Sequence, residues 1–79
     1  MTRESKMTIK AAAPTISYAS CDVIIESRDN GGKWTSQGIA PVLGTVEEVI
    51  VCRIARYEKF GWTLVSREDN VIILRKEFP

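Results

Sequence analysis

The stretch "YEKFGWTLVS", residues 57–66, decides how this chain folds, because it joins a helix to a strand. Its first residues continue a helical pattern, whereas "WTLVS" alternates apolar and polar residues as a strand does. Gly61 stands between the two halves, where helices commonly end in the left-handed conformation that glycine adopts without a Cβ penalty. The stretch therefore predicts a helix that ends near Phe60 and a strand that begins at Trp62.

The helix before Gly61 also has a recognisable start. Thr45 is a good N-cap, and Glu48 three residues later completes a capping box. One arc of this helix collects its apolar side chains, namely Val46, Val49, Ile50, Ile54, Tyr57 and Phe60. The β-branched run "VIVCRIA", residues 49–55, would suit a strand in isolation, but the capping box and Gly61 favour the helix.

Two strands and a turn are predicted before the helix. The run "TISYASCDVIIESR", residues 15–28, alternates as a strand, but the alternation slips near Ser20–Cys21, which predicts a β-bulge there or two short strands. The next residues, "DNGG" at 29–32, tolerate positive φ and predict a hairpin turn. The return strand, "KWTSQGIA" at residues 33–40, is polar and contains Gly38, which predicts an edge strand. The next residues, "PVLG" at 41–44, are expected to break the strand before the helix begins.

Two more strands are predicted after the helix, over residues 62–66 and 71–76, with a tight turn at 67–70. The last strand, "VIILRK", is apolar on both faces until Arg75, which predicts a central strand or one covered on both sides. The sequence therefore predicts an α+β fold, a small antiparallel sheet of about four strands in the order β-β-α-β-β, with the helix packed on one face.

The N-terminal residues carry a different signal. Residues 1–13 show no usable apolar periodicity, and Pro14 follows them, so we expect a flexible N-terminal arm and a single domain over residues 14–79. Chains this small bury only about 60% of their unfolded surface, so many of them depend on a partner. Part of one sheet face would keep apolar residues exposed, which predicts self-association as a homodimer.

The end of the chain resembles a group of small, uncharacterised prokaryotic domains that end a helix in a "GWELVS"-type turn. Their closing hairpin finishes in an apolar strand and a basic residue. The matching positions are Gly61, Trp62, Leu64, Val65 and Ser66, followed by Ile73, Leu74, Arg75 and Lys76. The glutamate of that turn is Thr63 here, and the similarity covers under a third of the chain. The resemblance implies the helix-to-strand turn and does not imply any particular activity.

The composition argues against several classes of site. The chain has no histidine, which removes the usual general base and the commonest metal ligand. Its two thiols, Cys21 and Cys52, fall on apolar stretches and are expected to be buried and free. We therefore expect no enzyme activity, no metal and no cofactor. No apolar run reaches the roughly 18 residues that span a bilayer, so we expect a cytoplasmic protein without a membrane partner.

Two groups of residues are candidates for a binding site. Arg53 falls inside the apolar arc of the helix, so it must extend to solvent, pair with Asp22 or Glu26, or face a partner. Together with Arg56, it would supply the anion contacts of a ligand pocket at a dimer interface.

The second group surrounds the hairpin turn. Arg28, Lys33 and Trp34 place basic and aromatic side chains on a sheet edge, which is the minimal set for binding single-stranded nucleic acid. Trp34 is either an exposed stacking residue or, as we favour, a cover for the small core.

The sequence thus predicts a non-enzymatic interaction or regulatory module that binds another macromolecule, with a protein as the expected partner. Such modules are found among bacterial and phage accessory proteins that act as inhibitors or regulators. The expected surfaces are the hairpin at residues 28–34 and the neighbourhood of Arg53, and the edge strand suits strand addition. Nucleic-acid binding through the hairpin, and small-ligand or nucleotide binding at a dimer interface, are the alternatives. The net charge of +1 favours neither nucleic acid nor an anionic membrane.

Overall fold

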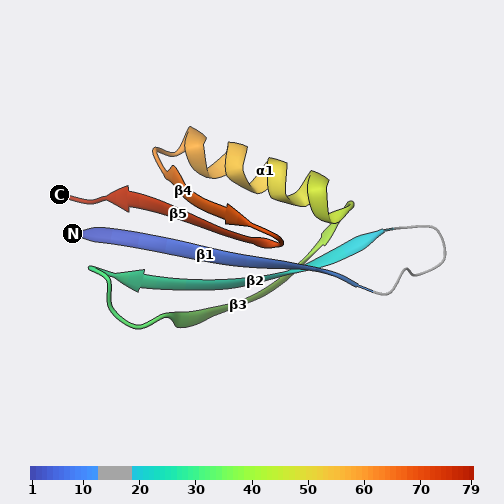
Figure 1. Cartoon of the computed structure of the whole chain (residues 1–79), viewed down its shortest axis with the longest axis horizontal. Helices are drawn as coiled ribbons and strands as arrows, with labels where there is room; N and C mark the ends of the chain where they lie inside the picture. The colour runs from blue at the N-terminus through green and yellow to red at the C-terminus, as the bar shows by residue number, and fades with distance from the viewer. Residues whose placement is uncertain (13–18) are drawn as a thin grey trace.

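The computed structural model describes residues 1–12 and 19–79. In chain order, the elements are β1 (Thr2–Ala11), β2 (Ser20–Asp29), β3 (Thr35–Leu43), α1 (Val46–Lys59), β4 (Thr63–Glu68) and β5 (Val71–Glu77). The strands form an antiparallel sheet in the order β3-β2-β1-β5-β4, and α1 lies across one face of it (Figure 1). The α+β class is confirmed, with five strands where about four were expected. The first predicted strand begins at residue 15, but residues 13–18 lie outside the described part of the chain.

The N-terminal segment is the central strand of the sheet, so the predicted flexible arm is wrong for Thr2–Ala11. Met7 stands opposite Ile25 of β2 on one side and Ile72 of β5 on the other. Met7 and Ile9 are fully buried on the face that α1 covers, whereas the alternate residues Lys6, Thr8 and Lys10 point to the opposite face. Because the residues on that second face are polar and charged, the alternation of apolar residues in β1 is weak in the sequence.

The core lies between α1 and the sheet. Its buried side chains are Met7, Ile9, Cys21, Val23, Val49, Ile50, Ile72 and Leu74. Cys21 is a buried free thiol, as predicted, and donates to the carbonyl oxygen of Gly44 at 3.3 Å. Cys52 is free but exposed, because it lies on α1 outside the arc that faces the sheet, so its predicted burial is wrong.

Strand β3 continues through Pro41 to Leu43, so the predicted break at "PVLG" is wrong. The N–H of Gly44 donates to the Ala19 carbonyl at 3.0 Å, so Gly44 and Ala19 form a hydrogen-bonded pair at the end of the β2–β3 ladder. Because such pairs alternate along an antiparallel ladder, the backbone groups of Ile39, Pro41 and Leu43 point away from β2. Pro41 has no backbone N–H, but that group would point to the open side of the edge strand, so the β2–β3 ladder loses no hydrogen bond.

The helix and the turn that follows it agree with the prediction. The backbone N–H of Glu48 donates to the Thr45 hydroxyl at 3.3 Å, which caps the start of α1. Gly61 has a φ of 90°, and the chain then reverses into β4. The rings of Tyr57 and Trp62 lie 5.2 Å apart between their centroids, so Trp62 packs on the last helical turn. This packing and the positive φ of Gly61 explain why the helix ends where it does.

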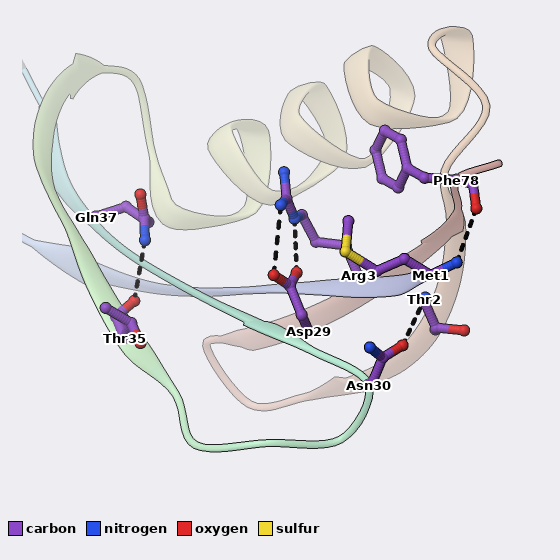
Figure 2. A network of polar contacts seen from close by, with 8 residues as sticks. All are labelled: Met1, Thr2, Arg3, Asp29, Asn30, Thr35, Gln37 and Phe78. Atoms are coloured by element: carbon purple, nitrogen blue, oxygen red, sulfur yellow. Dashed lines mark hydrogen bonds and ion pairs between the residues drawn. The ribbon is translucent and has the colours of Figure 1, made fainter.

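The two ends of the chain meet beside the β2–β3 turn. The amino group of Met1 donates to the Phe78 carbonyl at 2.8 Å, and the Thr2 N–H donates to Oδ1 of Asn30 at 3.0 Å (Figure 2). Nε of Arg3 pairs with Asp29 at 2.8 Å in the same region. Asn30 and Gly31 of the turn have φ values of 51° and 71°, which confirms the predicted hairpin. The contacts join β1 to the strands on both of its sides.

Candidate functional site

The predicted site residues fall on two surfaces rather than one. Arg28 and Trp34 lie on the sheet face opposite α1, because Arg28 is paired with Glu4, whose side chain points away from the core face of β1. Arg53 and Arg56 lie on α1 itself, on the other side of the sheet. Lys33 is exposed near the β2–β3 turn. The structure therefore brings Arg28 and Trp34 together and separates them from the helix arginines.

The first surface is a group of side chains that we call the Glu4 cluster. It consists of Glu4, Lys6, Arg28, Trp34 and Arg75. Glu4 is only 5% exposed, and its two carboxylate oxygens accept from Arg28 Nε at 2.8 Å and from Arg75 Nη2 at 3.2 Å. The ring of Trp34 carries two cations, with Arg28 Cζ 4.4 Å and Lys6 Nζ 4.6 Å from its centroid. The cluster thus places three cations around one carboxylate and one aromatic ring, and Lys6 also pairs with Glu26, outside the cluster, at 3.7 Å.

The pKa of the Glu4 carboxyl depends both on its burial and on the two arginines that contact it. Burial alone raises the pKa of the Glu4 carboxyl, but the hydrogen bonds and positive charges of Arg28 and Arg75 outweigh it and leave the pKa below its ordinary value of 4.5. A hydrogen bond from Arg3 likewise lowers the pKa of the Asp29 carboxyl from its ordinary value of 3.8. Both carboxylates are therefore favoured in their charged forms in the folded chain.

Acid is expected to destabilise the chain through these carboxylates. A carboxyl whose pKa is lowered by folding contributes stability above its unfolded pKa, and the contribution is lost as the pH falls through the folded pKa. For Glu4 the loss begins below about pH 4.5. Urea unfolding at a series of pH values should show this loss in the wild type and a smaller one in Glu4→Gln. The exposed Asp29→Asn serves as the control and should change the profile less. An unchanged profile in Glu4→Gln would contradict the assignment.

The Glu4 cluster leaves little of the predicted nucleic-acid site free. The charge of Arg28 is directed to Glu4, and the ring of Trp34 is already occupied by Arg28 and Lys6. Trp34 is half-buried, and its cation contacts lie on the face away from the core, so the prediction that it covers the core is wrong. Glu4 is the residue of this site that was not predicted, because it stands opposite Arg28 only when the N-terminal segment is a strand.

The second surface is a groove between the edge strand β3 and the helix, which we call the β3–α1 groove. It has a volume of about 370 Å³ and is lined by Val42 and Leu43 of β3 and by Glu48, Val49, Cys52, Arg53 and Arg56 of α1. Arg53 is half-buried and Arg56 is exposed. Within residues 1–12 and 19–79, neither arginine takes part in an ion pair. The groove therefore has an apolar wall on β3 and two positive charges on α1.

The two predicted carboxylate partners of Arg53, Asp22 and Glu26, lie on the sheet face opposite α1. Glu26 pairs with Lys6 at 3.7 Å on the opposite sheet face, and Asp22 lies on that same face, opposite Lys10. An acid on that face cannot reach a helix on the other. Of the three interpretations of Arg53, the ion pair with Asp22 or Glu26 is therefore wrong, and contact with solvent or with a partner remains.

The two edges of the sheet differ in how they meet solvent. Strand β3 has no charged residue from Thr35 to Leu43, and its Ile39 and Leu43 side chains are 65% and 71% exposed. Strand β4 carries Arg67 and Glu68, and Arg67 Nη2 donates to Glu47 of α1 at 2.6 Å. Charges protect an edge from pairing with other strands, so β3 is the less protected edge. Pro41 and the register shift between Ile25 and Glu26 are its main safeguards.

Neither surface gathers metal-ligating side chains. Among the described residues, no group of three or more cysteine or acidic side chains could hold a metal ion. The helix of this part of the chain, α1, is too short and too polar to cross a membrane. Comparison with protein-family models, with curated proteins and with solved structures found no match for the chain.

Proposed function

We propose that this chain is a non-enzymatic protein-binding module that takes an extended segment of a partner protein along β3. The observation that carries the proposal is an uncharged edge strand with exposed Ile39 and Leu43, placed beside the open β3–α1 groove. Addition of a strand to such an edge supplies affinity through the main chain and selectivity through alternate side chains. The module would regulate its partner by occupying that segment.

The backbone of β3 sets what such a segment can bond. Ile39 and Leu43 each offer an outward N–H and an outward carbonyl, whereas Pro41 offers a carbonyl alone. The incoming strand would lose one hydrogen bond at Pro41, and each such bond contributes about 1 kcal/mol. Strand addition is therefore weaker here than on an edge without proline. This suits a specific, reversible partner and limits pairing with unrelated strands.

The alternatives receive less support from the two surfaces. Nucleic-acid binding would need the cations and the ring that the Glu4 cluster already uses internally. A small ligand between two subunits would need a second copy to close the groove. A homodimer formed by pairing β3 with β3 would compete for the same edge, and sedimentation analysis distinguishes it from the binding of a foreign segment.

A library of random 12-residue peptides displayed on phage tests the proposal, because such a library samples many segments without a named partner. Peptides selected on the wild type are expected to bind Ile39→Pro about five- to tenfold more weakly, since this variant removes one outward N–H of β3. Ile39→Thr keeps the N–H and a β-branched side chain, and should bind within about threefold of the wild type. Fluorescence polarisation measures the affinities, and thermal unfolding checks that both variants fold.

Two outcomes would overturn the proposal. Selection that yields no binder, or binders that tolerate Ile39→Pro and Ile39→Thr equally, would show that the β3 edge is not the site. Sedimentation analysis of the free protein gives the other outcome: a dimer that Ile39→Pro dissociates would assign the edge to a second copy.

A further inference from the structure

We infer that the segment bound along β3 carries acidic side chains at alternate positions, and that Arg53 and Arg56 select it. This inference rests on the proposed function, because it concerns the segment that β3 would bind. It adds the chemical class of the partner, an extended acidic stretch of another protein, and it names the residues that recognise that class.

An added strand would place its side chains on both faces of the sheet. Alternate residues of such a strand point to the same sheet face, so one set would lie over the face of Ala40 and Val42, beside α1. The Val42 side of β3 forms one wall of the groove, and Arg53 and Arg56 lie on the other. The set of side chains on this face would therefore enter the groove and meet the two arginines.

The spacing of the two arginines on α1 matches the spacing of alternate residues in a strand. Arg53 and Arg56 are three residues apart on α1, which places their Cβ atoms roughly 5–6 Å apart on one side of the helix. Residues i and i+2 of a strand are roughly 6.7 Å apart. Two carboxylates at alternate positions can thus face the two guanidinium groups at once. Arginine binds a carboxylate through two parallel N–H groups, which favours acids over neutral side chains.

The charge of the groove is positive on the side of α1 that carries Arg53 and Arg56. Glu48 is the acidic residue among the side chains that line it, and its Oε1 accepts from the Thr45 hydroxyl at 3.0 Å in the helix cap. The apolar side chains of Val42 and Val49 lie against the same space and reduce the screening of charges by water. An anionic segment would therefore complement the groove.

A second copy of this chain fits the groove less well. Strand β3 contains no acidic residue between Thr35 and Leu43, so the pairing of two β3 strands would bring no carboxylate from that strand to Arg53 or Arg56. A foreign acidic segment satisfies both the edge and the arginines. For this reason we assign the groove to a partner protein.

The test repeats the phage selection on the wild type and on the double variant Arg53→Gln, Arg56→Gln. The wild type is expected to select peptides with Asp or Glu at positions i and i+2, and the double variant should lose this enrichment. A selected acidic peptide should bind the double variant about 10- to 100-fold more weakly, and its affinity for the wild type should fall with added salt. Lys33→Gln removes an exposed positive charge away from the groove and is the matched control, expected to leave binding unchanged.

The outcomes separate the inference from the proposed function. Binders that need the Ile39 N–H but show no acidic enrichment, or that ignore the double substitution, would overturn the inference and leave strand addition intact. Binders that ignore both Ile39→Pro and the double substitution would overturn both. A single-stranded oligothymidylate that displaces the peptide and depends on Arg53 and Arg56 would assign the groove to phosphate and would also overturn the inference.

Discussion

A chain that lacks residues 1–11 is expected to lose cooperative folding altogether. These residues include all of β1, the strand that joins the β2–β3 half of the sheet to the β5–β4 half. Their removal would take the fully buried Met7 and Ile9 from the core and leave β2 and β5 with unpaired edges. Circular dichroism and urea unfolding measure the effect, and the truncated chain should show no cooperative transition.

Point substitutions in β1 give the matched comparison. Ile9→Ala should lower the free energy of unfolding by about 2–5 kcal/mol, because it opens a cavity in the core. Lys10→Ala, at an exposed position next to it, should change that free energy by less than about 0.5 kcal/mol. A truncated chain that unfolds cooperatively at the wild-type midpoint would contradict the central position of β1 and restore the flexible arm.

The part of the fold that the sequence predicts correctly depends on signals between near neighbours. The capping box that begins at Thr45 and the glycine at position 61 define the two ends of α1 within a few residues. Asn30 and Gly31 define the hairpin in the same way, because their backbone angles are a local property. These elements depend little on what packs against them.

The part that the sequence predicts wrongly depends on contacts between distant residues. In β1, the side chains of Glu4 and Lys6 point away from α1, and they are satisfied by Arg28, Arg75 and Glu26 from neighbouring strands. Taken without those partners, the charges of the segment indicate a solvated arm. A strand with one polar face is stable at the centre of a sheet when cross-strand pairs cover that face.

The error at Pro41 has a different physical cause. Proline breaks a strand only if its missing N–H belongs to the ladder, and at position 41 that group would point to the open side of the sheet. The direction depends on the pairing register with β2, which the sequence does not reveal. A strand that ends at Ala40 omits Val42 and Leu43 from the candidate site, although Arg53 and Arg56 are correctly placed on the helix.

The Glu4 cluster leads to the second large prediction, which concerns Glu4→Ala. The substitution removes a buried carboxylate and leaves Arg28 and Arg75 side by side without their common partner. Loss of one partner from a fully buried ion pair costs about 3–5 kcal/mol. Because the Arg28 and Arg75 side chains are 29% and 49% exposed, water offsets part of this cost, and we expect a loss of about 2 kcal/mol in the free energy of unfolding.

Glu26, an acidic residue on the same sheet face, serves as the control that measures how much burial adds to the loss of stability. Glu26 pairs with Lys6 at 3.7 Å, and the Glu26 side chain is 30% exposed, so Glu26→Ala should cost no more than about 1 kcal/mol. Urea unfolding of the two variants at neutral pH compares them directly. Equal losses of unfolding free energy in the two variants would mean that the ion pairs of Glu4 contribute no more stability than the more exposed Glu26–Lys6 pair. If Glu4→Ala loses more, the cluster stabilises β1 at the centre of the sheet, because Glu4 lies on β1 while Arg28 and Arg75 come from the strands on either side.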